Sequence, residues 1–464
     1  MQHSEKNMDT IIAYAKRKGF VFPSSEIYDG LAGAYDFGPH GVVLLNVLKD
    51  HFRKHMVQER RDFYEIDSAM FKHPKVWDAS GHTSGFSDPI VECRDTQTRL
   101  RVDKELEALG VTADEKMPTE ELQKLFDEHA DEIAKRNKLP GNFTPVRAFN
   151  LLVQSNLGDF TGDGSGDPVY LPGEACQGIY LNYKNVVDTM HPKIPFGIAQ
   201  IGKAFRNEIS PRRFLFRTRE FEQADTQYFV RPGENKAHFD RIREERWNWH
   251  LSLGINPEHM RWKQHDNLVF YASDAWDIEY NFPSYGYDEV EGVHDRTDYD
   301  LNQHMEYSGT DLHYNDNGDK FIPYILETSM GMGRLFLEVL SEAYDEEDLS
   351  TEEKQDSRVV LRLKPFLSPV QVTVLPLMKK DGLAERGQEL YEMLNTTFRA
   401  SYDESGSVGK RYRRADEIGT PFCIMVDHDS LEDNTVTVRE RDSMEQVRVG
   451  IDEFESYLQS QIKE

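Results

Sequence analysis

Cysteine is scarce in this chain, which has three cysteines in 464 residues. Cys93, Cys176 and Cys423 are far apart and form no CxxC pair. This spacing argues against a disulfide framework and against a zinc ribbon, and a reducing, cytoplasmic setting fits it best. Long apolar runs are also missing: the mean hydropathy is -0.67, and no stretch approaches the ~20 apolar residues that span a bilayer. The first residues carry no apolar stretch behind a basic region, so we expect neither a secretory signal nor a membrane contact.

Positive charge is in deficit. The chain has 55 Lys and Arg against 82 Asp and Glu, which gives a net charge of -27. Such a protein does not bind nucleic acid through its bulk charge, although a local basic patch is compatible with an acidic body. The remaining composition, with 38% hydrophobic and 11% aromatic residues, is that of a folded protein, and at roughly 150 residues per domain the length predicts about two to four domains.

Changes of composition divide the chain into parts. Residues 1–92 and 141–344 mix helices, strands and turns without a βαβ order, which favours an antiparallel sheet with flanking helices. Residues 93–140 are charged and helical in pattern, and Pro118 splits them into two helices, so they are interpreted as a helical insertion. Residues 345–364 are predicted to be a polar linker. Residues 365–464 interleave strands and helices, as is typical of a compact α/β domain with a mixed sheet.

Hydrophobic periodicity predicts the individual elements. Helices are expected at residues 8–18, 42–57, 237–253, 334–344, 383–394 and 452–461. Strands are expected at residues 196–205, 218–230, 276–282, 321–327, 370–376, 422–426 and 435–439. The Gly- and Asp-rich segment 159–167 is expected to be a loop.

The most informative stretch is 197–225. Side chains alternate between the faces of a strand, so Arg206 shares a face with Glu208, and the return strand places the residues at 217, 219, 221, 223 and 225 together. A hairpin of this kind gathers guanidinium groups, an aromatic ring and carboxylates on one surface. That set suits a nucleotide, with arginine on phosphate and the ring of Phe221 against a base. A salt-bridged outer face of an amphipathic hairpin is the alternative that spacing alone leaves open.

Three other stretches say less by themselves. Segment 324–334 is an apolar strand with a polar end, followed by glycines and a helix that opens near Arg334, an arrangement that favours anions unless it is simply a tight turn. Segments 171–178 and 289–301 contain acidic residues, and each alone would be interpreted as a helix cap or a solvated loop.

Together these stretches resemble the homodimeric class II glycyl-tRNA synthetases over nearly the whole chain. Segment 196–223 is similar to class II motif 2, segment 327–334 to motif 3, and segment 39–57 to motif 1, which builds the dimer interface in that family. The N-terminal runs 17–28, 35–39, 77–82 and 85–89 also match. The resemblance implies an α+β fold: an antiparallel class II catalytic sheet with flanking helices over 1–92 and 141–344, and an α/β anticodon-binding domain over 365–464.

The resemblance also implies a reaction and a set of residues. The expected activity joins glycine to tRNA(Gly) through glycyl-adenylate, with ATP and Mg²⁺, in a cytoplasmic homodimer. Arg206, Glu208 and Arg334 are the expected catalytic residues, and Glu289 is expected to act with ATP and Mg²⁺. The expected ATP-binding residues are Arg206, Asn207, Glu208, Phe216, Arg217, Arg219, Phe221, Glu289, Val290, Gly331, Gly333 and Arg334. The expected glycine-binding residues are Arg101, Glu174, Phe221, Gln223, Asp225, Glu327 and Ser329.

Several positions depart from the family pattern. Position 225 is Asp where the family usually has Glu, and Thr328 replaces the proline of motif 3. Many relatives carry paired cysteines after the segment that matches Asp88-Pro89, whereas here Cys93 stands alone, so no zinc is expected. In the last domain the basic run 409–422 is the most telling, and Lys410, Arg411 and Arg413 are its candidate contacts to tRNA.

Two alternatives accompany this interpretation. One is a class II synthetase for another small amino acid, against which the set of Glu174, Glu327 and Ser329 argues. The other is a catalytically silent accessory subunit on the same fold. Such a subunit would be expected to have lost its phosphate-binding arginines, and here Arg206, Arg217 and Arg334 are all present.

Overall fold

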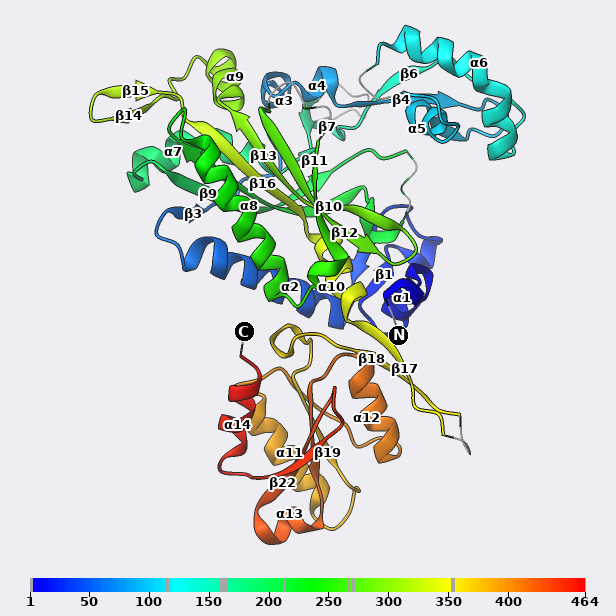
Figure 1. Ribbon diagram of the computed structural model, residues 1–464, viewed down its shortest axis with the longest axis vertical. Helices are drawn as coiled ribbons and strands as arrows, with labels where there is room; N and C mark the ends of the chain where they lie inside the picture. The colour runs from blue at the N-terminus through cyan, green and yellow to red at the C-terminus, as the bar shows by residue number, and fades with distance from the viewer. Residues whose placement is uncertain are drawn as a thin grey trace.

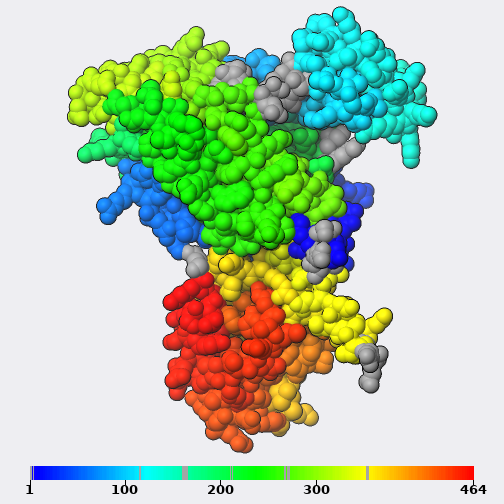
Figure 2. Space-filling model, viewed as in Figure 1, coloured from blue at the N-terminus to red at the C-terminus, as the bar shows by residue number. Residues whose placement is uncertain are grey.

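The computed structural model describes residues 3–113, 117–158, 166–209, 211, 213–265, 268, 272–351 and 355–463. A central body carries a smaller lobe around α5 and α6 on one side and a C-terminal lobe below (Figures 1 and 2). Most of the loop expected at 159–167 and part of the polar linker, at 352–354, lie outside the described residues. None of the described helices is both long enough and apolar enough to cross a membrane.

A seven-stranded sheet forms the centre of the body. Neighbouring strands run antiparallel, except that β3 is parallel to β9, so the expected antiparallel sheet is confirmed. In spatial order the strands are β11 (Met260–Gln264), β12 (Asp274–Phe282), β13 (Gly286–Thr297), β16 (Tyr324–Gly331), β10 (Glu220–Val230), β9 (Phe196–Phe205) and β3 (Phe63–Glu65).

Most of the predicted strands of the sheet are confirmed, and two predictions are wrong. The strand expected at 321–327 is split: β15 (Asp319–Phe321) ends a small hairpin and β16 begins at Tyr324, because Pro323 has no N–H for a ladder. Segment 289–301 is not a loop or cap but most of β13 and the start of α9 (Tyr299–Ser308). Its charged residue Glu291 can be buried in the sheet because Arg246 and His250 pair with it.

Three helices cover one face of the sheet (Figure 1): α2 (Pro39–Arg53), α8 (Asn235–Ser252) and α10 (Met332–Ala343). Their apolar residues and those of β10, β12, β13 and β16 form the main core. The helix expected at 42–57 begins earlier, at Pro39, whose missing N–H costs nothing in the first turn, and it continues as a π-helical turn at Lys54–Gln58. On the opposite face, α7 (Gln177–Met190) and α9 cover one end of the sheet with a second core, and the rest of that face carries polar side chains.

The lobe beside the body contains both helices and strands. Helices α5 (Val102–Glu107) and α6 (Thr119–Asn137) confirm the predicted pair, and α6 begins directly after Pro118. They pack on a small sheet of β4 (Ser87–Glu92), β5 (Arg99–Arg101) and β6 (Arg147–Asn150), with a core of their own around Phe126. The insertion is therefore not helical throughout.

The C-terminal lobe is the expected α/β domain with a mixed sheet. Its strand order is β20-β19-β21-β22-β23, in which β19 is parallel to β20 and β21 and the remaining pairs are antiparallel. The strands are β19 (Val372–Pro376), β20 (Ala400–Tyr402), β21 (Phe422–Val426), β22 (Thr435–Glu440) and β23 (Gln446–Gly450). The helices are α11 (Leu383–Leu394), α12 (Val408–Glu417), α13 (His428–Asp433) and α14 (Phe454–Gln461).

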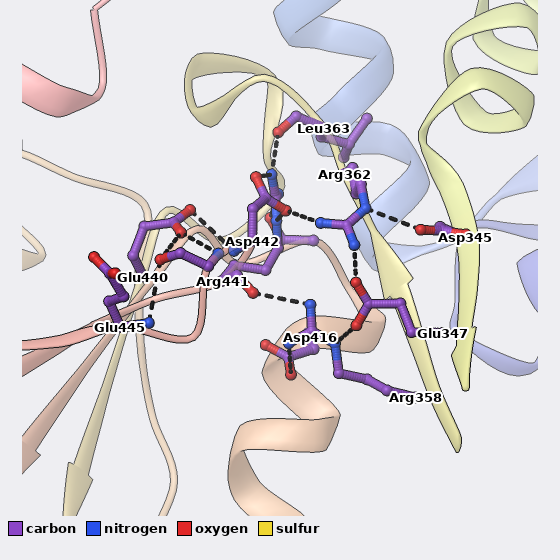
Figure 3. Close-up of polar contacts among 12 residues, drawn as sticks. Asp345, Glu347, Arg358, Arg362, Leu363, Asp416, Glu440, Arg441, Asp442 and Glu445 are labelled. Atoms are coloured by element: carbon purple, nitrogen blue, oxygen red, sulfur yellow. Dashed lines mark hydrogen bonds and ion pairs between the residues drawn. The ribbon is translucent and has the colours of Figure 1, made fainter. Parts of the chain in front are cut away.

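The segment between body and C-terminal lobe is a β-hairpin rather than a polar linker without structure. Strand β17 (Tyr344–Asp348) pairs with β18 (Ser357–Leu361). Figure 3 shows how arginines tie this hairpin to the C-terminal lobe. Arg362 contacts Asp345 at 3.0 Å and Asp442 at 2.9 Å, while Arg358 donates to the carbonyl of Arg441 at 2.9 Å.

Shorter elements complete the chain. They are α1 (Met8–Arg17), β1 (Val21–Pro23), β2 (Tyr35–Phe37), α3 (Lys75–Ala79), α4 (His82–Gly85), β7 (Gln154–Leu157), β8 (Asp167–Tyr170) and β14 (Tyr314–Asp316). Helix α1 also touches the C-terminal lobe, because Lys18 pairs with Glu417 and the hydroxyl of Tyr14 donates to the Glu417 carbonyl.

Candidate active site

A cavity of about 130 Å³ opens on the polar face of the sheet, between the segment that joins β9 to β10 and the start of α10. Much of the expected ATP-binding set lines it, together with Gln223 and Ser329 of the expected glycine set. The lining residues are Arg206, Glu208, Leu215, Phe216, Arg217, Thr218, Phe221, Gln223, Glu289, Ser329, Gly331, Gly333 and Arg334.

Arg206 is the first cation of this cavity. Strand β9 ends at Phe205, so Arg206 and Glu208 lie just beyond the ladder rather than within a hairpin strand as expected. The guanidinium lies 5.3 Å from the ring centroids of both Phe86 and Phe221, and its Nε donates to the Gly173 carbonyl at 3.2 Å. No carboxylate among the described residues pairs with it, so Arg206 is a positioned cation that can accept an anionic ligand.

Arg334 is a second cation that lines the cavity. It follows Gly331 at the start of α10, where the orphan N–H groups of a helix already favour negative charge. Its Nε donates to the Phe216 carbonyl at 3.2 Å, and its Nη1 lies 3.1 Å from a carboxylate oxygen of Glu289. The charge of Arg334 is the main reason that the pKa of Glu289 lies below its ordinary value, so Glu289 is a carboxylate that stays ionised.

Glu327 and Glu174 do not line this cavity and are already paired. Glu327 accepts hydrogen bonds from Arg296 at 3.1 Å and from Gln227 at 2.8 Å, and lies 3.1 Å from His294. Burial opposes the ionisation of Glu327, but Arg296 and His294 together outweigh it and the pKa falls to about 2.

Glu174 accepts from the Gln177 amide at 2.9 Å and lies 3.5 Å from His82. Burial works against its charge, but His82, Arg296 and Gln177 together more than compensate, and the pKa of Glu174 lies well below its ordinary value.

Asp225 differs from these carboxylates. It pairs with Ser329 across β10 and β16, its side chain is 1% exposed, and neither carboxylate oxygen has a hydrogen-bond partner among the described residues. Burial, helped by the negative charge of Glu327, raises its pKa well above the usual range. A buried carboxylate without a partner is costly, and a cationic ligand beside it would remove that cost.

Other expected residues lie elsewhere. Val290 is buried in the main core. The Arg219 Nε donates to the backbone carbonyl of Glu208 at 2.9 Å, and the Asn207 N–H donates to the Leu151 carbonyl at 2.7 Å.

Arg101 does not line the cavity either. It belongs to β5, and its guanidinium pairs with Asp88 at 3.0 Å and with Asp103 at 2.5 Å.

The basic run of the C-terminal domain forms α12. Arg411 is buried at 3% exposure, and its guanidinium donates to the carbonyls of Pro376 and Leu377. Lys410 is exposed, and Arg413 is half-buried with Asp356 at 3.3 Å. The structure therefore separates Arg411, which supports the domain, from its two neighbours on the surface.

Sequence reasoning missed several residues that shape the site. Arg296 neutralises Glu327, and Phe86 and His82 contact Arg206 and Glu174. A period-two pattern from residue 290 to 296 could have identified β13, but its charged residues concealed it.

Comparisons with known proteins agree with this geometry. Residues 160–343 match the family described as tRNA synthetase class II core domain (G, H, P, S and T), and residues 371–461 match the anticodon binding domain. The chain is 46% identical to a glycine--tRNA ligase of Treponema denticola, over 100% of this chain and 99% of that relative. It is also 46% identical to those of Clostridium tetani, over 99% of both chains, and Geobacillus thermodenitrificans, over 98% of this chain and 97% of the relative.

The antiparallel sheet, the cavity arginines and the appended domain define a class II aminoacyl-tRNA synthetase. Because the identity extends over the full chain, the chain belongs to the glycine--tRNA ligase family within that class. The expected fold class and family are confirmed.

Proposed function

We propose that the cavity binds ATP and presents its α-phosphorus to the carboxylate of glycine. The observation that carries this proposal is Arg206, a cation held between two aromatic rings without a carboxylate partner among the described residues. Arg334 supplies a second positive charge in the cavity, and Phe221 offers a face for the adenine. The glycine carboxylate attacks, the adenylate bond forms, and pyrophosphate leaves with the electron pair of the broken bond. The protein positions both reactants and neutralises charge without a covalent intermediate.

Mg²⁺ fits one part of this cavity. Glu289 is an ionised carboxylate at the edge of the phosphate-binding arginines, and carboxylates that share Mg²⁺ with phosphates are its usual protein ligands. Glu289 would hold the ion, which supplies further neutralisation of phosphate charge.

We assign the glycine ammonium to the buried carboxylates next to the cavity. Asp225 supports this assignment best, since both of its oxygens lack a partner among the described residues, whereas Glu327 and Glu174 are already paired. One methylene is worth only about 1–3 kcal/mol of discrimination in a pocket, so selection of glycine needs a firm grip on the ammonium and little space around Cα. Gln223 and Ser329 border this position, with Gln223 Nε2 3.5 Å from Ser329 Oγ.

The direct test is amino-acid-dependent ATP–pyrophosphate exchange with a panel of small amino acids. Exchange with glycine alone is expected. Arg206→Ala is expected to lower kcat/KM by about 10²–10³-fold, the usual loss when one charge-stabilising donor is removed. Lys203→Ala is the matched control, because this exposed lysine on the same hairpin pairs with Glu220 and does not line the cavity.

Asp225→Asn keeps the shape of the side chain and removes its charge, and it is expected to raise the KM for glycine far more than the KM for ATP. Exchange with alanine or serine instead of glycine would refute the glycine pocket. A folded wild-type protein without exchange for any amino acid would refute the activation reaction.

For the tRNA we propose contacts to Lys410 and Arg413. We also propose the following domain bounds: a catalytic domain at 1–92 and 141–344, an insertion at 93–140, a linker at 345–364 and an anticodon-binding domain at 365–464. Replacing Lys410 by Ala is expected to weaken tRNA(Gly) binding and to leave pyrophosphate exchange unchanged. Because its tRNA substrate is used by ribosomes, we place the activity in the cytoplasm.

We also propose a homodimer through α2 and the segment before it. Ile27, Tyr28 and Val42 are 87%, 79% and 41% exposed in the single chain, and an interface through α2 and the segment before it would cover such apolar side chains. Sedimentation velocity is expected to give twice the chain mass, and a single Val42→Asp change is expected to shift the protein to monomer.

A further inference from the structure

A second group of polar side chains lies beside the cavity, at the far edge of the sheet. His265 follows β11, Asp277 lies in β12 and His294 lies in β13. Ala275 is opposite His294 in the β12–β13 register and accepts the backbone N–H of His265, and Asp277 is two residues further along β12. The three side chains therefore share one face of the sheet. A nitrogen or oxygen of each lies within 4.8 Å of the others.

The surroundings of His294 are those of a metal ligand. Its Nδ1 lies 3.1 Å from the Glu327 carboxylate, whereas its Nε2 is buried and has no hydrogen-bond partner among the described residues. Histidines that bind metals commonly use their other ring nitrogen on a carboxylate in this way, which fixes the ring and the tautomer. The Nε2 atom is therefore available to a metal ion.

Gly292 keeps the space beside these atoms open. It pairs with Asp277 across the two strands, and a Cβ at this position would lie 3.0 Å from His294 Nε2 and 3.5 Å from Asp277 Oδ1. Asp277 is 8% exposed, and its other oxygen lies 2.7 Å from His265 Nε2. The absent side chain leaves two nitrogens and a carboxylate facing one another without an intervening group.

The charge around the cluster suits a dication. Glu289 is close enough for its negative charge to act on His265 and Asp277, while Lys263 is the nearby opposing cation. The negative charges of Asp277 and Glu289 together compensate the charge of a divalent ion. Neutral imidazole ligands favour transition metals over Mg²⁺ or Ca²⁺.

We propose that His265, Asp277 and His294 form a binding site for a divalent transition-metal ion, with Zn²⁺ the best match. Two imidazoles and one carboxylate with an open position are a usual donor set for this ion. The sequence argument against zinc concerned cysteine ligands, whereas this site contains none. The site lies next to Glu289, but none of its three ligands is assigned to ATP or glycine, so metal binding can be measured without either substrate.

The test is a titration of the full-length, chelator-treated protein with Co²⁺ alone, followed by visible absorption, and then displacement by Zn²⁺. The expected result is a ligand-field band that saturates and is abolished by Zn²⁺. His265→Ala and Asp277→Asn should each lower the affinity by about 100-fold or more, since each removes a ligand rather than a neighbour of one. His313→Ala is the matched control, because His313 also pairs with an aspartate but lies on the surface.

Circular dichroism at the titration temperature verifies that each variant is folded, and Asp277→Asn preserves the side-chain shape if His265→Ala does not fold. A second histidine cluster, His3 with His259 and Glu342, has stacked rings 3.7 Å apart. If this second cluster also binds Co²⁺, the wild type should bind two equivalents of Co²⁺ per chain, and the His265→Ala and Asp277→Asn variants should each bind one. No saturable Co²⁺ or Zn²⁺ binding by the wild type would overturn the proposal, and so would unchanged affinity and stoichiometry in both ligand variants.

Discussion

His250 is predicted to carry a positive charge in the interior of the protein. It lies on α8 at 0% exposure, with Nδ1 3.0 Å from Glu338 and Nε2 3.0 Å from Glu291. Both neighbours are carboxylates, and only the protonated ring can donate from both nitrogens. Arg246 also pairs with Glu291, at 2.6 Å, so the group has two positive and two negative members.

The consequence for stability follows from the pKa. Burial disfavours the charged ring, but Glu338 and Glu291 outweigh burial and raise the pKa of His250 from 6.5 to about 9. A raised pKa means that the folded state holds the proton more tightly than the unfolded state. The resulting stabilisation, about 3 kcal/mol, is fully present below pH 6.5 and is lost as the pH rises through 9.

The assay combines urea unfolding, followed by tryptophan fluorescence, with histidine-selective NMR titration. Trp249 is a suitable reporter, since its ring centroid lies 5.3 Å from that of His250. Glu338→Gln should lower the pKa of His250, flatten the dependence of the urea midpoint between pH 6.5 and 9, and cost about 3–5 kcal/mol at pH 6.5, because it breaks a buried pair. Glu244→Gln, on the exposed side of α8, is the matched control. An unshifted His250 pKa in Glu338→Gln would refute the reasoning, as would a wild-type titration near pH 6.5.

Two further predictions concern folding. Gly41→Ala should destabilise the body by about 1–3 kcal/mol or more, because the new Cβ would lie 1.8 Å from the backbone oxygen of Phe20. Gly409→Ala, with open space around it, should be neutral or stabilising when urea unfolding is followed by circular dichroism. Asp416→Asn should cost the C-terminal domain about 3–5 kcal/mol, because the buried carboxylate holds Arg439 at 2.9 and 3.1 Å. The variant's C-terminal domain is expected to unfold separately, at a lower urea concentration than the body. All five tryptophans lie between residues 77 and 276, so circular dichroism, and not tryptophan fluorescence, should report this first transition. A shift of both signals at the same urea concentration would contradict separate unfolding of the domain.

The sequence predicted the strands and helices with clear apolar periodicity. The strand at 196–205 and the helix at 383–394 have the bounds that were expected. It failed for β13, because alternation of buried charges resembles a solvated loop until the partners on α8 are known. Periodicity reports which side chains avoid water but not which charges neutralise one another across the fold.

The same limit applies to the site. Motif resemblance led to the lining of the cavity, including Arg206 and Arg334. It could not show that Arg101 and Arg411 have partners within the chain. Nor could it show that Asp225, rather than Glu327, is the carboxylate that has no hydrogen-bond partner among the described residues. The sequence does not show which opposite charge lies beside a given cation or carboxylate, and only the tertiary structure identifies that partner.

The hairpin of β17 and β18 has a consequence for the proposed RNA substrate. Arginine bridges fasten it to the C-terminal domain, and Lys18 and Tyr14 add a second attachment from α1. With two attachments on separate segments, the domain resists both swivelling and stretching. The distance between the body and the C-terminal domain is then held nearly constant. A tRNA that touches both lobes must match this distance or bend to fit it, so the strain of any mismatch falls on the RNA.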